Sequence, residues 1–111
     1  MGRVYVNVFG TEDTVVVALC DEDLPGRVLK HGDLEVEVEP RFYVGENVTE
    51  DEALRELERV IEEYRHEKTV AVNALGENAC RVVIRAGLAE HDDLGDIAGV
   101  PHVQVYLLPR E

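Results

Sequence analysis

The chain is predicted to fold as one α+β domain, with a mixed β-sheet that contains an N-terminal hairpin and has two helices packed on it. Three patterns support this prediction. Residues 3–9 alternate apolar and polar side chains, as a half-buried strand does. Residues 14–20 are continuously apolar and rich in valine, which is typical of a strand buried on both faces. Between residues 49 and 65 the apolar side chains instead recur at helical spacing.

The remaining strands are expected from similar patterns. The four residues from Gly10 to Asp13 join the first two strands as a hairpin. Residues 34–39 alternate strictly, so their three glutamates should face water up to Pro40. Residues 69–75 and 103–108 read as two further strands. The resulting order, β-β-β-α-β-α-β, favours a mixed sheet within a single domain over residues 1–111.

Two helices are expected near residues 50–65 and 77–86. Thr49 and Glu52 have the spacing of a capping box at the start of the first helix. The polar side of that helix is acidic and should simply be solvated. Gly87 has the position of a glycine that ends the second helix.

The charge is strongly negative, with 24 acidic residues against 11 lysines and arginines, for a net charge of −13. This charge repels a nucleic-acid backbone over long range, although high salt would screen the repulsion. Few glutamines and methionines and many charges also suit a hot and salty environment. We therefore interpret the acidity first as thermophilic and halophilic adaptation.

Other features exclude several classes of protein. No apolar run is long enough to span a bilayer, and the first residues do not read as a signal peptide, so a cytoplasmic location is expected. The sequence has no serine, which removes the serine nucleophiles. Cys20 and Cys80 lie in apolar runs and should be buried, reduced thiols. No metal site and no cofactor is expected, and residues 21–23 and 91–93 are interpreted as loop acids.

One polar surface stands out in the last strand. If the strand begins at His102, then His102, Gln104 and Tyr106 share one face, opposite three apolar residues. These side chains either face solvent without a role or form a recognition surface. An unperturbed histidine would make such recognition depend on pH between about 5.5 and 7.5.

A second polar cluster lies at the start of the second helix. Gly76 opens this helix between Asn73 and Asn78, where free backbone N–H groups favour an anion. Arg81 and Arg85 share one edge of the helix at i and i+4. The alternative is an ordinary turn, with Asn78 capping the helix and both arginines paired with surface acids. Phe42 and Tyr43 are expected to anchor an edge of the core.

Four short motifs resemble an archaeal family, domain of unknown function 424. They are Cys20-Asp21-Glu22, the Phe42-Tyr43-x-Gly45 step, the Asn73-x-x-Gly76 turn and Pro101-His102-x-Gln104. The resemblance covers nearly the whole chain. It implies an archaeal setting and no known reaction. It also implies a helix that enters the Asn-x-x-Gly step, so residues 69–75 have a second interpretation as helix.

Three hypotheses for the function follow. The first is a non-enzymatic binding module, an accessory of RNA or ribonucleoprotein machinery, with a protein or RNA as its partner. The second is a small enzyme that uses His102 as general acid or base with Tyr106 or Gln104. The third is a structural or oligomeric partner. The absence of a catalytic signature favours the first hypothesis. Its candidate binding residues are Asn73, Gly76, Asn78, Arg81, Arg85, His102 and Gln104.

Overall fold

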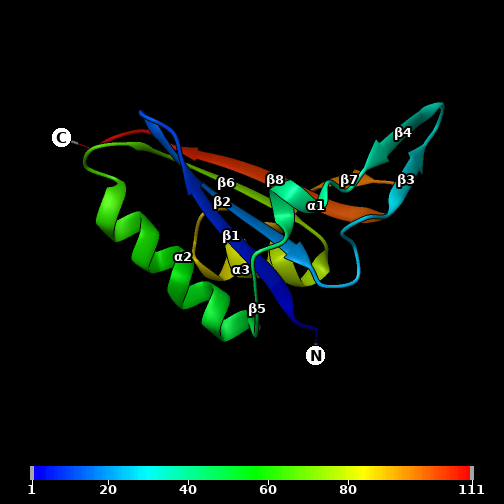
Figure 1. The fold of residues 1–111 in the computed structure, drawn as a ribbon, viewed down its shortest axis with the longest axis horizontal. Coiled ribbons are helices and arrows are strands. Elements are labelled where there is room, and N and C mark those ends of the chain that lie inside the picture. The colour runs from blue at the N-terminus through cyan, green and yellow to red at the C-terminus, as the bar shows by residue number, and fades with distance from the viewer. Residues whose placement is uncertain (1, 111) are drawn as a thin grey trace.

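The structure is a computed structural model that describes residues 2–110, and a six-stranded mixed sheet forms its centre (Figure 1). In sheet order the strands are β5 (Glu46–Val48), β1 (Val4–Gly10), β2 (Thr14–Asp21), β6 (Thr69–Leu75), β8 (Val100–Leu107) and β7 (Gly95–Ile97). β2 and β6 are parallel, and every other neighbouring pair is antiparallel. The predicted α+β fold, with its mixed sheet and N-terminal hairpin, is confirmed.

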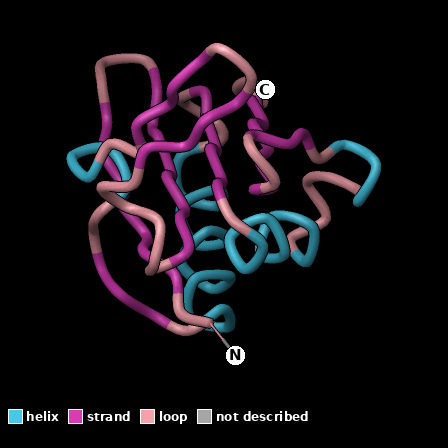
Figure 2. Tube along the Cα trace, turned by 90° about the vertical axis from the view of Figure 1, so that its right-hand side faces the viewer, coloured by secondary structure: helices cyan, strands magenta, loops and turns pink. Residues whose placement is uncertain are grey.

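The two longer helices, α2 (Glu50–Tyr64) and α3 (Glu77–Arg85), pack on the same face of the sheet (Figure 2). The predicted capping box is present, because Thr49 Oγ1 accepts from the backbone N–H of Glu52 and Glu52 Oε1 accepts from that of Thr49. The main core lies between the helices and the sheet and includes the fully buried Leu19 and Leu57.

β6 confirms the strand interpretation of residues 69–75, so the helical alternative is wrong. Val70, Val72 and Ala74 point into the main core, while the residues between them lie on the opposite face. This alternation has a period of two, which a helix could not satisfy. A central strand flanked by β2 and β8 also buries its backbone hydrogen bonds on both sides.

Several short elements were not predicted. The strand expected over residues 34–39 is the shorter β4 (Leu34–Glu37), which pairs with an unforeseen β3 (Val28–His31) in a separate two-stranded sheet. We call this β3–β4 hairpin the arm. The helix α1 (Pro40–Tyr43), the 3₁₀ helix η1 (His91–Asp93), β5 and β7 were also missed. Apart from β4, whose alternation was recognised, these elements of three or four residues are too short to show a clear period.

β8 begins at Val100, three residues earlier than predicted, and so contains Pro101. A proline inside a sheet normally loses a ladder hydrogen bond. Here Pro101 lies beside Gly76, just beyond the end of β6, and the Gly76 carbonyl already accepts from Cys80 N–H in α3. The proline therefore removes no bond from the sheet.

A second, smaller core lies on the face of the sheet opposite the helices, which we call the open face. Cys20 and Leu75 from the sheet pack there against Tyr43 of α1 and Leu29 of the arm. The arm and α1 cover this end of the open face and leave the other end uncovered. No helix in the described part of the chain is long and apolar enough to cross a membrane.

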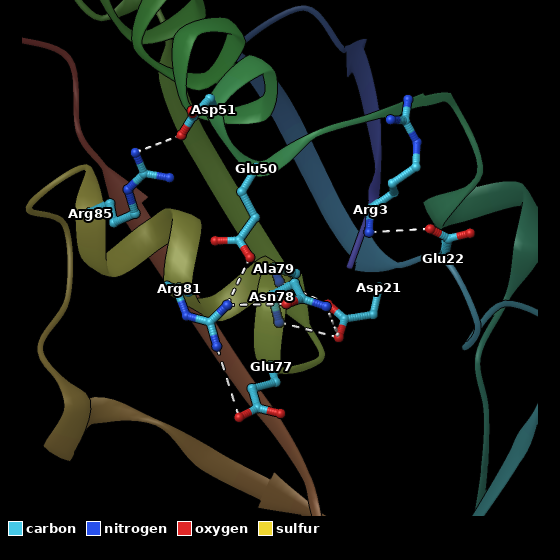
Figure 3. Close-up of polar contacts among 10 residues, drawn as sticks. All are labelled: Arg3, Asp21, Glu22, Glu50, Asp51, Glu77, Asn78, Ala79, Arg81 and Arg85. Carbon is cyan, nitrogen blue, oxygen red and sulfur yellow. Dashed lines mark hydrogen bonds and ion pairs between the residues drawn. The ribbon is translucent and has the colours of Figure 1, made fainter. Parts of the chain in front are cut away.

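Asp21 is buried at the end of β2, which corrects its interpretation as a loop acid. Its Oδ1 accepts from the backbone N–H of Ala79 at 2.8 Å, and its Oδ2 accepts from the backbone and side-chain nitrogens of Asn78 at 3.2 and 3.1 Å (Figure 3). Burial raises the pKa of Asp21, and the N–H donors of α3 only partly oppose this effect. Asp21 thus caps α3 from 57 residues away in sequence.

Gly76 makes this cap possible. It is the N-cap residue of α3, with φ of +110°, and offers no side-chain cap of its own. A Cβ at this position would collide with the Asp21 carboxyl group. A glycine is therefore required both for the backbone conformation and for the approach of Asp21.

Replacing Asp21 should lower the stability of the fold and leave the exposed surface of the protein unchanged, because Asp21 is buried. We expect Asp21→Ala to lower the free energy of unfolding by about 2–3 kcal/mol, because it leaves buried donors at the helix start unsatisfied. Asp21→Asn keeps one acceptor and should cost less. Urea unfolding at pH 7 followed by circular dichroism measures both. An alanine variant as stable as the wild type would contradict the capping role.

The two thiols should be unreactive in the folded protein. Cys20 and Cys80 are free, buried, and on opposite faces of the sheet, and burial raises the pKa of each to about 12. An unfolded thiol ionises near pH ~8.5, so the free energy of unfolding should fall as pH rises above that value. Ellman titration should find no fast thiol in native protein and two after unfolding. A fast-reacting thiol in the native state would contradict this prediction.

Candidate functional site

The predicted binding residues do not form one surface, because the sheet separates them. Asn73, His102 and Gln104 lie on strands, with their side chains on the open face. The other four, Gly76, Asn78, Arg81 and Arg85, belong to the start and body of α3 on the helical face. Sequence reasoning grouped these seven residues because Asn73 is only three residues before Gly76, although the sheet places the two sets on opposite faces.

The anion site expected at the start of α3 is already filled by the chain itself. The free N–H groups predicted there donate to the Asp21 carboxylate, and Asn78 contributes its own side-chain nitrogen to the same oxygen. The remaining N–H of Gly76 donates to the Pro101 carbonyl at 2.8 Å. Asn78 is therefore not the N-cap residue, and of the N–H groups at this helix start only that of Glu77 has no partner among residues 2–110, which does not make an anion site.

The two arginines of α3 are paired with acidic residues, as expected if this cluster is an ordinary turn and not a binding site. Arg81 Nη1 lies 2.7 Å from Glu50 Oε2, and Arg85 Nη2 lies 2.8 Å from Asp51 Oδ1 (Figure 3). Both acids come from the first turn of α2. These contacts join the two helices across their exposed edges and leave the arginines poorly placed to bind a ligand.

On the open face, Asn73 holds α1 against the sheet. The Tyr43 hydroxyl donates to Asn73 Oδ1 at 2.7 Å, and Asn7 Nδ2 donates to the Phe42 carbonyl at 2.8 Å. The four-residue helix α1 is thus fastened to both β1 and β6. Asn73 therefore has a structural role in addition to its position beside Gln104.

His102 and Gln104 make no side-chain hydrogen bond within residues 2–110, in contrast to Asn73. Both line a groove of about 570 Å³ along the outer side of β8. His102 is half-buried, and burial lowers its pKa. Any binding that depends on its protonation would therefore change at lower pH than the sequence suggested.

The structure gives the enzymatic hypothesis little chemistry to build on. No acid or second base is hydrogen-bonded to His102 in the described residues. The same residues contain no group of histidine, cysteine and acidic side chains that could hold a metal ion. Cys20, which could be imagined as a nucleophile, is buried in the second core with a raised pKa.

The uncovered end of the open face carries a row of apolar side chains that sequence reasoning mostly missed. Phe9, Val16, Ala71 and Tyr106 are direct neighbours across β1, β2, β6 and β8. Phe9 and Tyr106 are exposed, by 37% and 64%. The alternation of β1 could have identified Phe9, but only the sheet order shows that it lines up with Tyr106.

Phe42 of α1 forms a wall at the border between the covered and uncovered ends. Its ring packs edge-on against Phe9, with centroids 5.5 Å apart. Between this wall and Tyr106 lies a hollow of about 420 Å³, which we call the open-face hollow. Its lining residues include Thr14, Val16, Phe42, Ala71, Asn73, Gln104 and Tyr106.

Three of the four motifs noted in the sequence have clear structural roles. Asp21 caps α3, Gly45 passes so close to the Val6 carbonyl that a Cβ would collide with it, and Asn73 holds Tyr43. The fourth motif, around Pro101, is only partly explained, because Pro101 contacts Gly76 while the side chains of His102 and Gln104 have no hydrogen-bond partner among residues 2–110.

A comparison with solved structures agrees with this fold. One similar structure is described as a "Crystal structure of an uncharacterized conserved protein from Methanopyrus kandleri". It shares 52% sequence identity with a TM-score of 0.94, over 98% of this chain and 95% of that one. No curated protein matches the chain. A family model described as "Protein of unknown function (DUF424)" matches residues 9–108, and the chain therefore belongs to the DUF424 family.

Proposed function

We propose that the protein is a non-enzymatic binding module that holds a segment of a protein partner in the open-face hollow. The observation that carries this proposal is the half-covered open face. One end is closed by the arm and α1, while the other has a hollow lined by the exposed Tyr106 and two amides, with the exposed Phe9 packed against its Phe42 wall. Exposed apolar groups that gather around a hollow, with a few polar groups beside them, are typical of a binding surface.

The composition of the hollow fits a peptide-like ligand. Aromatic edges from Phe42 and Tyr106 offer apolar contact area at low entropic cost. Gln104 has a free amide that can both donate and accept, which matches the backbone of an extended segment. The lining of the hollow contains neither lysine nor arginine, so the hollow has no cationic side chain to neutralise a phosphate.

The charge of the chain favours a basic partner over RNA. A net charge of −13 attracts lysine- and arginine-rich segments and repels phosphates. Proteins of ribonucleoprotein assemblies are often basic, because they bind RNA. We therefore propose that the protein is an accessory of such machinery that contacts one of its basic proteins. The two buried free thiols fit a reducing compartment, and we place this activity in the cytoplasm.

The acidity itself is proposed to be environmental. Arg59 bridges Glu56 and Glu63 on α2, at 2.7 and 2.6 Å, in the kind of surface network that tolerates heat. Most other acids of α2 face water, where they repel one another at low salt.

Mutations of the aromatic side chains in and beside the hollow should weaken capture of a basic protein from an archaeal lysate. We expect Tyr106→Ala and Phe9→Ala each to weaken binding about tenfold or more, since each removes exposed aromatic contact area. Leu34→Ala is the matched control, because Leu34 is equally exposed, at 66%, but lies on the arm. Quantitative pull-down with and without ribonuclease measures the effect. Loss of the captured protein on ribonuclease treatment would contradict direct protein recognition and indicate RNA as the ligand.

Salt should stabilise the protein if its acidity is environmental. Raising KCl from about 0.05 to about 1 M should increase Tm, because the Debye length shortens and repulsion among the acids is screened. Differential scanning calorimetry measures this shift, with sucrose as a control for general exclusion effects. A Tm that falls on adding KCl would contradict the environmental interpretation.

A further inference from the structure

Only the first part of the outer edge of β8 is paired with another strand. β7 pairs with β8 from Val100 to His102 and then ends, while β8 continues to Leu107. Within residues 2–110, the only strands that pair with β8 are β6 on its inner side and β7 at this one end. The outer side of residues 103–107 therefore has no neighbouring strand.

The backbone groups at this edge can be assigned from the pairing. The Pro101 carbonyl accepts from Gly76 N–H, so Pro101 turns its backbone towards the β6 side. Alternate residues of an antiparallel strand share this direction, so Val103 and Val105 also face β6. Gln104 and Tyr106 then present their N–H and C=O groups outward. Among the hydrogen bonds of the described residues, none reaches these four groups.

The strand at this edge carries none of the charges that normally protect a sheet edge, and the groove beside it has one charged lining residue, Asp93. No aspartate, glutamate, lysine or arginine occurs from Ile97 to Pro109, although such residues make up 32% of the chain. The opposite edge is different. Where β5 leaves β1, the adjoining groove is lined by charged side chains of α2. Exposed edges without charge are the ones that pair with another strand.

We propose that two copies of the chain pair antiparallel along their β8 strands, about a twofold axis at Val105. In this register Gln104 of each copy lies opposite Tyr106 of the other, and the outward groups of both residues form four hydrogen bonds. Val105 lies opposite its own counterpart, and Val103 lies opposite Leu107. The two sheets then become one continuous sheet.

A second copy fits this edge better than an unrelated strand. The pairing is self-complementary, as a twofold interface requires. It also brings together the stretch of the chain where like-charge repulsion between two copies of net charge −13 is smallest. The unpaired edge has the same length on either side of Val105. β7 occupies it up to His102, and β8 ends at Leu107, shortly before Pro109. This proposal does not depend on the open-face hollow having a ligand.

Sedimentation of the full chain tests the dimer directly. We expect a dimer whose population rises with concentration between about 1 µM and 1 mM, and which is tighter at about 1 M than at about 0.1 M KCl because salt screens the repulsion. Val105→Lys and Val105→Glu should each weaken association at least tenfold, by placing like charges across the axis. An equal mixture of the two should restore a heterodimer. Glu58→Gln makes the same change in net charge as Val105→Lys, on exposed α2, and should not weaken association.

Amide exchange tests the register. The N–H groups of Gln104 and Tyr106 should exchange fast in dilute protein and at least tenfold slower in the dimer, while those of Val103 and Val105 stay protected in both. If the Val105 variants do not fold, Gln104→Pro removes only an outward N–H and should abolish the dimer. The proposal is overturned by a chain that stays monomeric at about 1 mM in both salts. The proposal is also overturned if the dimer forms as tightly in these variants as in the wild type, or if the Gln104 and Tyr106 amides exchange as fast in the dimer as in dilute protein.

Discussion

The burial of the Asp21 carboxyl group against the first turn of α3 is the contact on which the arrangement around it depends. It joins the end of β2 to the start of α3, two segments that are 57 residues apart in sequence. To allow this contact, Gly76 adopts a conformation with positive φ, and its N–H is left to bind Pro101. The ends of β2, β6 and β8 are thereby fixed relative to one another. A charged group is costly to bury, and three hydrogen bonds from a helix start are among the few environments that compensate for it.

The same contact explains why the helical side of the molecule offers little for recognition. A helix start, an asparagine and two arginines resemble an anion site in the sequence, yet all are used within the chain. Polar groups without internal partners remain on the other face, where the sheet is only half covered. Function is therefore best sought where the fold leaves groups unsatisfied, rather than where polar residues are most concentrated.

The fold could be predicted where patterns were long and local. Alternation identified β1, a continuous apolar run identified β2, residues 69–75 were read as the strand β6, and the Thr49–Glu52 capping box marked the start of α2. β4 was predicted from its alternation, but its partner β3, α1 and β7 were not, because each spans at most two periods of its own pattern and is stabilised by contacts with distant segments. The site was predictable only in part. Alternation placed His102 and Gln104 on one face, but no local signal shows that Arg81 lies on the far side of the sheet or that a distant aspartate fills the helix start.

The fastening of α1 to the sheet has a consequence for how this surface can diverge. The four residues of α1, held by the Tyr43–Asn73 and Asn7–Phe42 hydrogen bonds, form one wall of the open face, and the side chain of Phe42 is not part of the main core. In the binding module that we propose, a substitution at residue 42 would therefore alter the wall of the hollow without repacking the main core. The main core and this wall are encoded in separate segments of the chain.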